Sequence, residues 1–297
     1  MSWIEGVSLY GGTHMKNILV GTDLTGKSEN AVIRAIQLSK LSGATLHVLH
    51  VNRSIEVPGN SDATALARAE LGERVRDIVR QYAGSSELEY EAHIESRGRV
   101  YERVIEYVRK VRADLVVIGR STRPDVLPDS VFLTTGHVIS DAPAPVLVVT
   151  QPVSGNYRHI LLETHLSNSP EAALAPVHDF GPDIRLTLLI DAEGMPQDSA
   201  GLIQRLITGI RRRRYEKYVA RAASLLRKRG IAEDRLSPAV VEHDYEAVLL
   251  SKLKDEEIDV VGIVGMRRKL HNLDTGSNIL ADLQTASCDL LAKPGIH

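Results

Sequence analysis

A glycine–serine pair near the end of the chain, Gly276-Ser277, opens an apolar segment at 278–286 whose pattern predicts a helix. Free backbone N–H groups at a helix start favour an anion, and a serine hydroxyl adds a donor. Gly276, Ser277 and Asn278 therefore form a candidate phosphate site. The basic residues 267–269 in the preceding loop add positive charge. The alternative is that Ser277 only caps the helix beside a flexible glycine, which is the commoner role of such a pair.

A carboxylate, Asp23, follows the first apolar segment of the chain, residues 16–21. In open α/β sheets, ligands bind beyond the carboxyl ends of strands, at the point where the strand order reverses. The residues that end the apolar segments are therefore candidate ligand contacts: Gly21, Thr22, Asp23, Val51, Gly119 and His165. Asp23 could instead cap the next helix or fix its own loop, and a loop histidine such as His165 commonly has no role.

Other residue types that do chemistry lack the spacing that a known site requires. Cys288 is the only cysteine, which excludes an intrachain disulfide, and its apolar neighbours predict a buried, inert thiol. The histidines show no metal-binding spacing, so no metal site is expected. The Gly-x-Ser-x-Gly elbow of hydrolases is absent, as are the His-x-Gly-His of nucleotidyltransferases and the Ser-Gly-Gly-x-Asp-Ser loop of ATP pyrophosphatases. Binding is therefore favoured over catalysis.

Apolar segments alternate with amphipathic ones along the chain. In its first half, strands are predicted at 18–21, 45–51, 89–94, 115–119 and 146–150, and helices at 28–42, 63–82, 100–111 and 134–141. Strands rich in Val, Leu and Ile that alternate with helices predict an α/β fold, with a parallel sheet covered on both faces. Right-handed crossovers are expected between the strands.

Three pairs of anchors recur at nearly one spacing, which indicates that the chain contains the same unit twice. Asp23 and His165 lie 142 positions apart, Asp114 and Asp259 lie 145 apart, and Ala144 and Cys288 lie 144 apart. The sequence thus predicts two doubly wound, Rossmann-like domains at 15–151 and 157–294, related by a pseudo-twofold axis, after a disordered leader at 1–14. The last strand of each domain is an edge, and pairing of these two strands would hide both.

The composition excludes several classes of protein. With 297 residues, a net charge of −2 and 4% aromatic residues, the chain lacks the basic surface of a DNA-binding protein and the stacking platforms of single-strand binders. Four arginines at 211–214 wrap around a predicted helix at 200–229 and do not form one basic face. No apolar run reaches the ~20 residues of a membrane span. We therefore expect a cytoplasmic protein without nucleic-acid or membrane partners.

The two predicted domains resemble tandem domains of the universal stress protein (UspA-like) family, which has an adenine nucleotide alpha hydrolase-like fold. The resemblance depends on an opening strand that ends in Asp23, on residues 114–119 in the fourth strand and on residues 142–149 in the last strand. ATP-binding members of the family carry Gly-x-x-Gly, nine residues, and then Gly-Ser or Gly-Thr. The first half of that motif holds phosphates in the loop after the fourth strand, and the second half lies at a helix start.

The first domain keeps the carboxylate of the family site and lacks its phosphate loop. It retains Asp23 and Gly119, but Thr122 stands where the second glycine belongs. Phe132-Leu133 occupies the place of Gly-Ser at the helix start. An aromatic ring and a leucine there would block a phosphate.

The second domain keeps part of the phosphate loop and lacks the carboxylate. It retains Gly265 and Gly276-Ser277, with Arg268 in place of the other glycine. His165 stands where the family has aspartate, and an imidazole could still contact a base or a ribose.

The resemblance implies a stress-response regulatory protein that works by binding, with degenerate nucleotide sites and without turnover. One alternative is a sensor that binds ATP or AMP, with Mg, in the second domain, and that hydrolyses ATP slowly at most. Another is a protein that binds a different small metabolite in the same clefts. The fused domains would form a pseudo-dimer within one chain, acting on a protein partner that the sequence does not identify, and further homodimerisation is left open.

Overall fold

The computed structural model describes residues 14–55, 61–85, 87–119, 128–166, 168–175, 177, 179–181, 183–191, 202–241, 245–264 and 288–293. The strands are β1 (Asn17–Thr22), β2 (Thr45–Val51), β3 (Tyr90–Glu95), β4 (Leu115–Gly119), β5 (Val146–Val149), β6 (His159–His165), β7 (Arg185–Asp191), β8 (Leu236–Val241), β9 (Val260–Val264) and β10 (Asp289–Lys293). The helices are α1 (Gly26–Ser42), α2 (Ser61–Ala83), α3 (Val100–Lys110), α4 (Pro128–Asp141), α5 (Pro170–Leu174), α6 (Leu202–Arg227) and α7 (Tyr245–Asp255), with short 3₁₀ turns η1 (Arg53–Ile55) and η2 (Glu233–Arg235).

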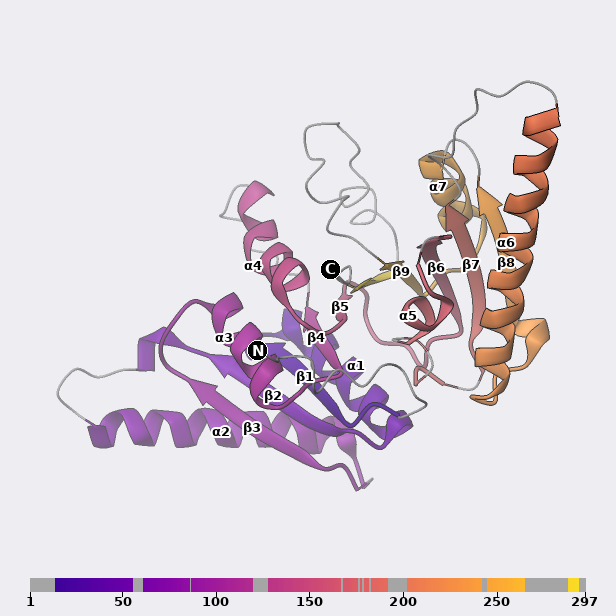
Figure 1. Ribbon diagram of the computed structural model, residues 1–297. Coiled ribbons are helices and arrows are strands. Elements are labelled where there is room, and N and C mark those ends of the chain that lie inside the picture. Colours follow the sequence, from indigo (N-terminus) through magenta and orange to yellow (C-terminus); the bar gives the residue numbers. More distant parts are fainter. Residues whose placement is uncertain are drawn as a thin grey trace, which may run out of the picture.

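The strands form one mostly parallel sheet of ten, in the order β3-β2-β1-β4-β5-β10-β9-β6-β7-β8 (Figure 1). Each neighbouring pair is parallel except β5 and β10, which are antiparallel. The first half, β1–β5, and the second half, β6–β10, therefore have the same strand order, and they meet at their last strands. The predicted α/β class and the predicted pairing of the two last strands are confirmed.

The register at the centre of the sheet is the one that a twofold axis requires. Leu147 of β5 faces Leu291 of β10, and these two residues are separated by the same 144 positions as Ala144 and Cys288. Equivalent residues thus pair with each other across the junction. An antiparallel pair of equivalent strands also removes two exposed edges from the middle of the sheet.

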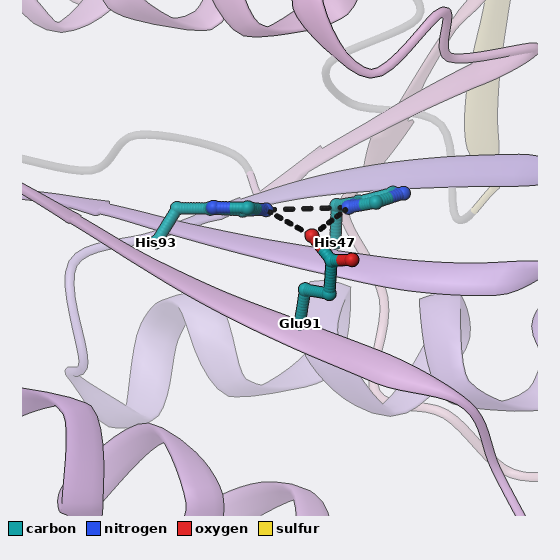
Figure 2. A group of neighbouring side chains, drawn as sticks. All are labelled: His47, Glu91 and His93. Carbon is teal, nitrogen blue, oxygen red and sulfur yellow. Dashed lines mark hydrogen bonds and ion pairs between the residues drawn. The ribbon is translucent and has the colours of Figure 1, made fainter.

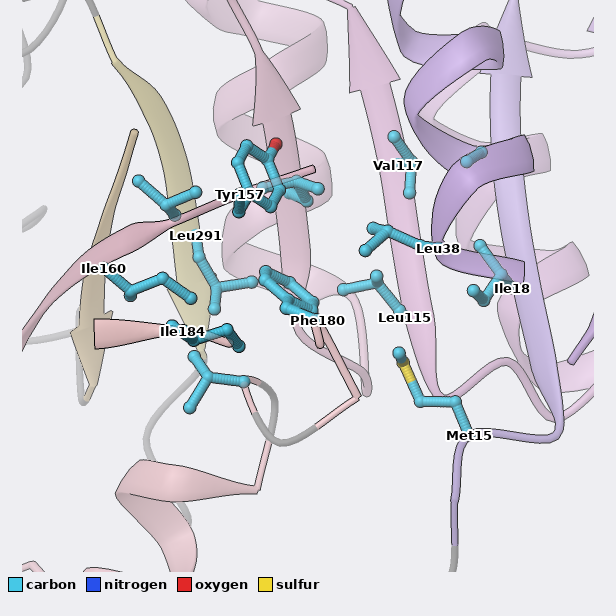
Figure 3. Close-up of a cluster of buried hydrophobic side chains, with 14 of the residues drawn as sticks. Met15, Ile18, Leu38, Leu115, Val117, Tyr157, Ile160, Phe180, Ile184 and Leu291 are labelled. Atoms are coloured by element: carbon cyan, nitrogen blue, oxygen red, sulfur yellow. The ribbon is translucent and has the colours of Figure 1, made fainter. Parts of the chain in front are cut away.

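Helices cover both faces of the sheet, and each face has its own apolar core. Helices α1, α2, α5 and α6 contribute to one core, and α3, α4 and α7 to the other. The first core is continuous across the two halves, because Leu38 and Leu115 belong to the same cluster as Phe180 and Leu291 (Figure 3). Apolar contact across the junction therefore adds to the hydrogen bonds of the sheet.

A buried carboxylate at the start of β10 fixes the segment that follows β5. Asp289 Oδ1 accepts hydrogen bonds from the backbone N–H groups of Thr150 and Gln151, at 2.8 and 3.2 Å. Its Oδ2 accepts a bond of 2.5 Å from the Tyr157 hydroxyl, and the guanidinium of Arg34 lies 3.7 Å from the centre of the Tyr157 ring. Burial and Asp289 raise the pKa of Tyr157 well above its usual value, so the hydroxyl keeps its proton and donates.

Several elements differ from their predicted bounds. Helix α4 begins at Pro128 and not at residue 134, because proline suits the first helical position and Asp129 suits the first turn. The second half does not repeat α1 at full length, since α5 spans only five residues. The predicted leader lies outside the described residues except His14, whose Nδ1 is 2.8 Å from Asp179 Oδ1. Among the described helices, none is long and apolar enough to cross a membrane.

Candidate functional site

The strand order of the first half reverses between β1 and β4, and the residues that follow these strands form the candidate site. Strand β2 lies on the far side of β1, while β4 pairs with β1 through contacts such as Gly21 with Ile118. A ligand cleft is expected beyond the carboxyl ends of two strands at such a point. Asp23 directly follows β1, and Gly119 ends β4.

The carboxylate of Asp23 is held in a single orientation by three hydrogen bonds to Oδ1. The donors are the Thr25 backbone N–H at 2.9 Å, the Thr25 hydroxyl at 2.6 Å and the Ser28 hydroxyl at 2.6 Å. The predicted alternative role of Asp23, fixing its own loop, is therefore real. Asp23 is nevertheless exposed, so the orientation that these bonds impose is presented to solvent.

The same hydrogen bonds decide the charge of the site. Partial burial raises the pKa of Asp23, but the bonds from Ser28 and Thr25 outweigh this effect and lower the pKa below its ordinary value. A carboxylate that accepts several hydrogen bonds is stabilised in its charged form. Asp23 is thus an anion at neutral pH and can accept hydrogen bonds from hydroxyl or amino groups.

The loop that carries Asp23 is anchored and strained. Thr22 is buried, and its hydroxyl lies 2.8 Å from the Ser28 hydroxyl in the first turns of α1. Leu24 has a φ of +59°, a left-handed conformation that leucine rarely adopts. Residues in such conformations persist where the surroundings impose them, and they cluster at binding sites.

The other predicted contacts of the first half end neighbouring strands. Val51 ends β2 and Gly119 ends β4, and both are half-buried. Gly21 is not required by a turn, since a Cβ atom there would lie 3.6 Å from Ile118 Cγ2, an ordinary contact. The structure therefore brings Asp23, Val51 and Gly119 to one edge of the sheet, with Thr22 as an anchor below them.

His50 is a residue of this edge that the sequence reasoning missed. It lies in β2 opposite Thr22, is buried, and its Nδ1 donates a hydrogen bond of 2.9 Å to the Thr22 carbonyl. Its Nε2 is buried without a hydrogen-bond partner in the described part of the chain. The available signal was an imidazole in a largely apolar strand, directly before Val51.

The start of α4 is the place at which the resemblance implies a phosphate site, and here it is unfavourable for an anion. The helix opens with Pro128-Asp129, and proline has no N–H to donate while aspartate adds negative charge. Phe132 was expected at the helix start, and this is wrong, because the fifth residue of α4 lies one turn inside the helix. Thr122 lies outside the described residues.

The corresponding position in the second half is differently occupied. His165 ends β6 and pairs in register with Asp191, the last residue of β7. Glu163 pairs with Ile263 as Gly21 pairs with Ile118, and its side chain is buried. The predicted phosphate-binding residues Gly265, Gly276, Ser277 and Asn278 lie outside the described residues, as does the helix expected at 278–286.

Two further predictions concern residues away from both strand edges. Arg212, Arg213 and Arg214 are exposed on α6, and Arg212 Nε donates to Glu216 at 2.9 Å, as expected for a solvated helix face. Cys288 is buried, and burial raises the pKa of its thiol to about 12. The prediction of an inert cysteine is confirmed, since the reactive form is the thiolate.

Comparison with known proteins identifies the first half of the chain. Residues 14–150 match the model of the universal stress protein family. This part of the chain belongs to that family. Over 114 residues the chain is 28% identical to universal stress protein A homolog 1 of Coxiella burnetii, an alignment that covers 36% of this chain and 76% of that protein.

Solved universal stress proteins share the fold of the whole chain. One from Archaeoglobus fulgidus DSM 4304 aligns with a TM-score of 0.59 at 14% identity, covering 94% of this chain and 96% of that one. A second, described as a putative universal stress protein from Pseudomonas aeruginosa UCBPP-PA14, aligns with a TM-score of 0.57 at 16% identity, covering 95% and 93%. Both alignments cover more than nine-tenths of this chain, so its overall fold recurs in other single chains.

Proposed function

We propose that this chain is a stress-response regulatory protein of the UspA type, which works by binding and not by turnover. The observation that carries the proposal is the fixed, ionised and exposed carboxylate of Asp23 at the reversal of strand order in the first half. We further propose that residues 15–151 and 157–294 are tandem domains, whose sites have diverged from those of ATP-binding members of the family.

The groups at the first site favour a ligand that donates hydrogen bonds and carries no phosphate chain. Asp23 accepts through its carboxylate, and His50 Nε2 is a second acceptor while Nδ1 donates to Thr22. A phosphate would meet the charge of Asp23 and the helix start at Pro128-Asp129. A nucleoside, with its ribose hydroxyls and exocyclic amine, has the matching chemistry.

A second candidate function is a sensor of ATP or AMP, with Mg, in the second half. The spacing of Gly276-Ser277 to Cys288 in the sequence favours this candidate. The buried Glu163 opposes it, because a carboxylate stands at the strand position that Gly21 holds in the first half. We therefore place the nucleoside-binding site in the first half and treat slow ATP hydrolysis as the weaker alternative.

Calorimetric titration with adenosine and with ATP separates these candidates. Adenosine should bind the unmodified chain, and Asp23→Asn should weaken it about tenfold or more, the usual loss for a hydrogen bond to a charged group. Asp77→Asn, which changes an exposed aspartate on α2, is the matched control and should bind normally. Absence of adenosine binding, or binding that Asp23→Asn leaves unchanged, would exclude the nucleoside proposal.

Native mass spectrometry of the purified chain tests the ATP sensor. If ATP co-purifies and is lost in Ser277→Tyr but kept in Asp23→Asn, the second half is the nucleotide site and our preference is wrong.

We also propose a cytoplasmic location and a protein partner, without nucleic-acid or membrane contacts. Pull-down with and without adenosine tests the partner, and light scattering tests further homodimerisation.

A further inference from the structure

Three polar side chains gather on the outer strands of the first half, toward the opposite end of the strands from Asp23. His47 comes from β2, and Glu91 and His93 come from β3 (Figure 2). His47 pairs in register with Glu91, and Leu49 pairs with His93, so all three side chains lie on one face of the sheet. His47 Nδ1 lies 3.2 Å from His93 Nε2 and 3.4 Å from Glu91 Oε2, and the latter two atoms are 3.5 Å apart.

These distances match the coordination shell of a transition metal. A tetrahedral zinc ion with bonds of about 2.0–2.2 Å to nitrogen and oxygen separates its ligand atoms by about 3.3–3.5 Å. Two imidazoles and one carboxylate are a donor set that suits Zn²⁺ better than Mg²⁺ or Ca²⁺, which prefer oxygen. We propose that His47, Glu91 and His93 bind one Zn²⁺ ion per chain.

The residues around the three ligands support this role. Asn17 Oδ1 on β1 lies 3.2 Å from His47 Nε2, the nitrogen that would not face the metal. A metal-binding histidine usually donates its other N–H in this way, and the bond fixes the ring. The Tyr107 ring of α3 packs against the His93 ring, with centroids 4.9 Å apart. The Glu91 side chain is 61% exposed, so water can reach a fourth position.

The hydrogen bond to Asn17 also selects a tautomer that suits a metal. With a proton on Nε2, His47 donates to Asn17 and leaves the Nδ1 lone pair for the ion. His93 then carries a proton on one nitrogen, and coordination through Nε2 requires that proton to lie on Nδ1. Zinc replaces a hydrogen bond between two neutral rings, and no ligand has to give up a net proton.

The expected effect of the ion is to hold the outermost strand. Strand β3 is the edge of the sheet, and its neighbour β2 supplies the third ligand. Crosslinking the two through one ion would stabilise the edge, by an amount that grows with the logarithm of the free zinc concentration once this exceeds the Kd. The strand-by-strand counterparts in the second half are Thr187, Ser237 and Ala239, which provide no such set of ligands.

Isothermal titration of the untagged, chelator-treated full chain with ZnCl₂ tests the proposal. We expect one ion per chain, and a visible absorption band of a four-coordinate ion when Co²⁺ replaces Zn²⁺. Glu91→Gln, at an exposed position, and His93→Gln should each weaken binding tenfold or more. His137→Gln is the control, because His137 is an exposed imidazole on α4 that stacks on Tyr101. It should bind zinc like the unmodified chain.

Circular dichroism of each metal-free variant shows whether the fold is retained, and Glu91→Gln keeps the test decisive if His93→Gln unfolds. The proposal is overturned if the unmodified chain binds no zinc at one equivalent. It is equally overturned if Glu91→Gln, folded, binds zinc as tightly as the unmodified chain, since the ion would then be held elsewhere. None of these outcomes depends on whether adenosine binds at Asp23.

Discussion

The two halves of the sheet have the same strand order and the same register, but they carry different chemistry at matching positions. Buried apolar positions are preserved in kind, as at Leu147 and Leu291. At polar positions the residue type changes between the halves. His47 corresponds to Thr187, and Asn17 corresponds to His159. The core constrains what the sheet positions can hold, whereas positions at the ends and the outer strands are free to change.

The strand ends at which the order reverses differ in the same sense. The first half has Gly21 and Asp23, and the second half has Glu163 and His165. A small residue with an exposed anion has been replaced by a buried carboxylate with a titratable ring. Two halves with one strand order thus present different side chains at the same strand ends, and a shared fold is no evidence of a shared ligand.

The largest difference between matching positions is at Asp289, a buried carboxylate whose counterpart in the first half is Pro145. Asp289→Ala should reduce the free energy of unfolding by about 3–5 kcal/mol, since the N–H groups of Thr150 and Gln151 and the Tyr157 hydroxyl would lose a buried acceptor. Urea denaturation measures this change. Pro145→Ala is the matched control, and a cost for Asp289→Ala no greater than that of the control would contradict the assigned role.

Leu147 and Leu291 test whether the symmetry is also energetic. Both side chains are fully buried and face each other across the junction. Leu147→Ala and Leu291→Ala should each lower the free energy of unfolding by about 2–5 kcal/mol, the usual range for such a cavity. The two losses should be similar. The same urea titration applies. If one substitution costs more than twice the other, the two sides of the junction are packed differently despite the matching register.

The apolar framework was predictable because it depends on local sequence. Strands β2 and β4 match the predicted 45–51 and 115–119 to the residue, since runs of Val, Leu and Ile bounded by polar residues have few other interpretations. The predicted start of α4 at residue 134 was wrong, because Pro128 is a helix-start signal in its own right.

The polar clusters were only partly predictable, because they depend on register between strands. Asp23 could be found from its place after β1, but its donors Thr25 and Ser28 could not be ranked without the loop conformation. His47 and His93 are 46 positions apart, and only the pairing of β2 with β3 brings them together. No metal site was predicted, because His47 and His93 do not show the short spacing of two ligands on one helix.

Asn17, beside the proposed zinc ligands, can be compared with its counterpart in the second half, His159. Asn17→Ala removes the acceptor of His47 Nε2, and loss of such a partner typically weakens metal binding by about 10–100-fold. In the second half, His159 occupies the place of Asn17 and its Nε2 lies 2.8 Å from the Thr187 hydroxyl. His159→Ala should therefore leave the zinc affinity unchanged. Equal affinities for Asn17→Ala and the unmodified chain would remove the positioning role of Asn17.

Ser28 gives the smallest expected effect and tests the charge at the first strand end. Ser28→Ala removes one of the donors to Asp23 Oδ1, so the pKa of Asp23 should rise toward its ordinary value. The free energy of unfolding near pH 7 should fall by about 0.5–1.5 kcal/mol, the net value of a typical hydrogen bond. Carboxyl ¹³C NMR titration measures the pKa directly. Ser42→Ala is the control, because the Ser42 hydroxyl, at the other end of α1, donates to the backbone carbonyl of Leu38.

The sign of the pH dependence follows from the direction of that shift. Because folding lowers the pKa of Asp23, the stabilisation it provides is fully present above the unfolded pKa of about 4 and is lost as the pH falls through the folded pKa. Ser28→Ala narrows the gap between the two values, so the variant should lose less stability between pH 5 and acid than the unmodified chain does. The second half has His165 at this position, so this strand end should contribute no matching acid transition there. A variant whose stability falls as steeply with acid as that of the unmodified chain would show that Thr25 alone sets the charge of Asp23.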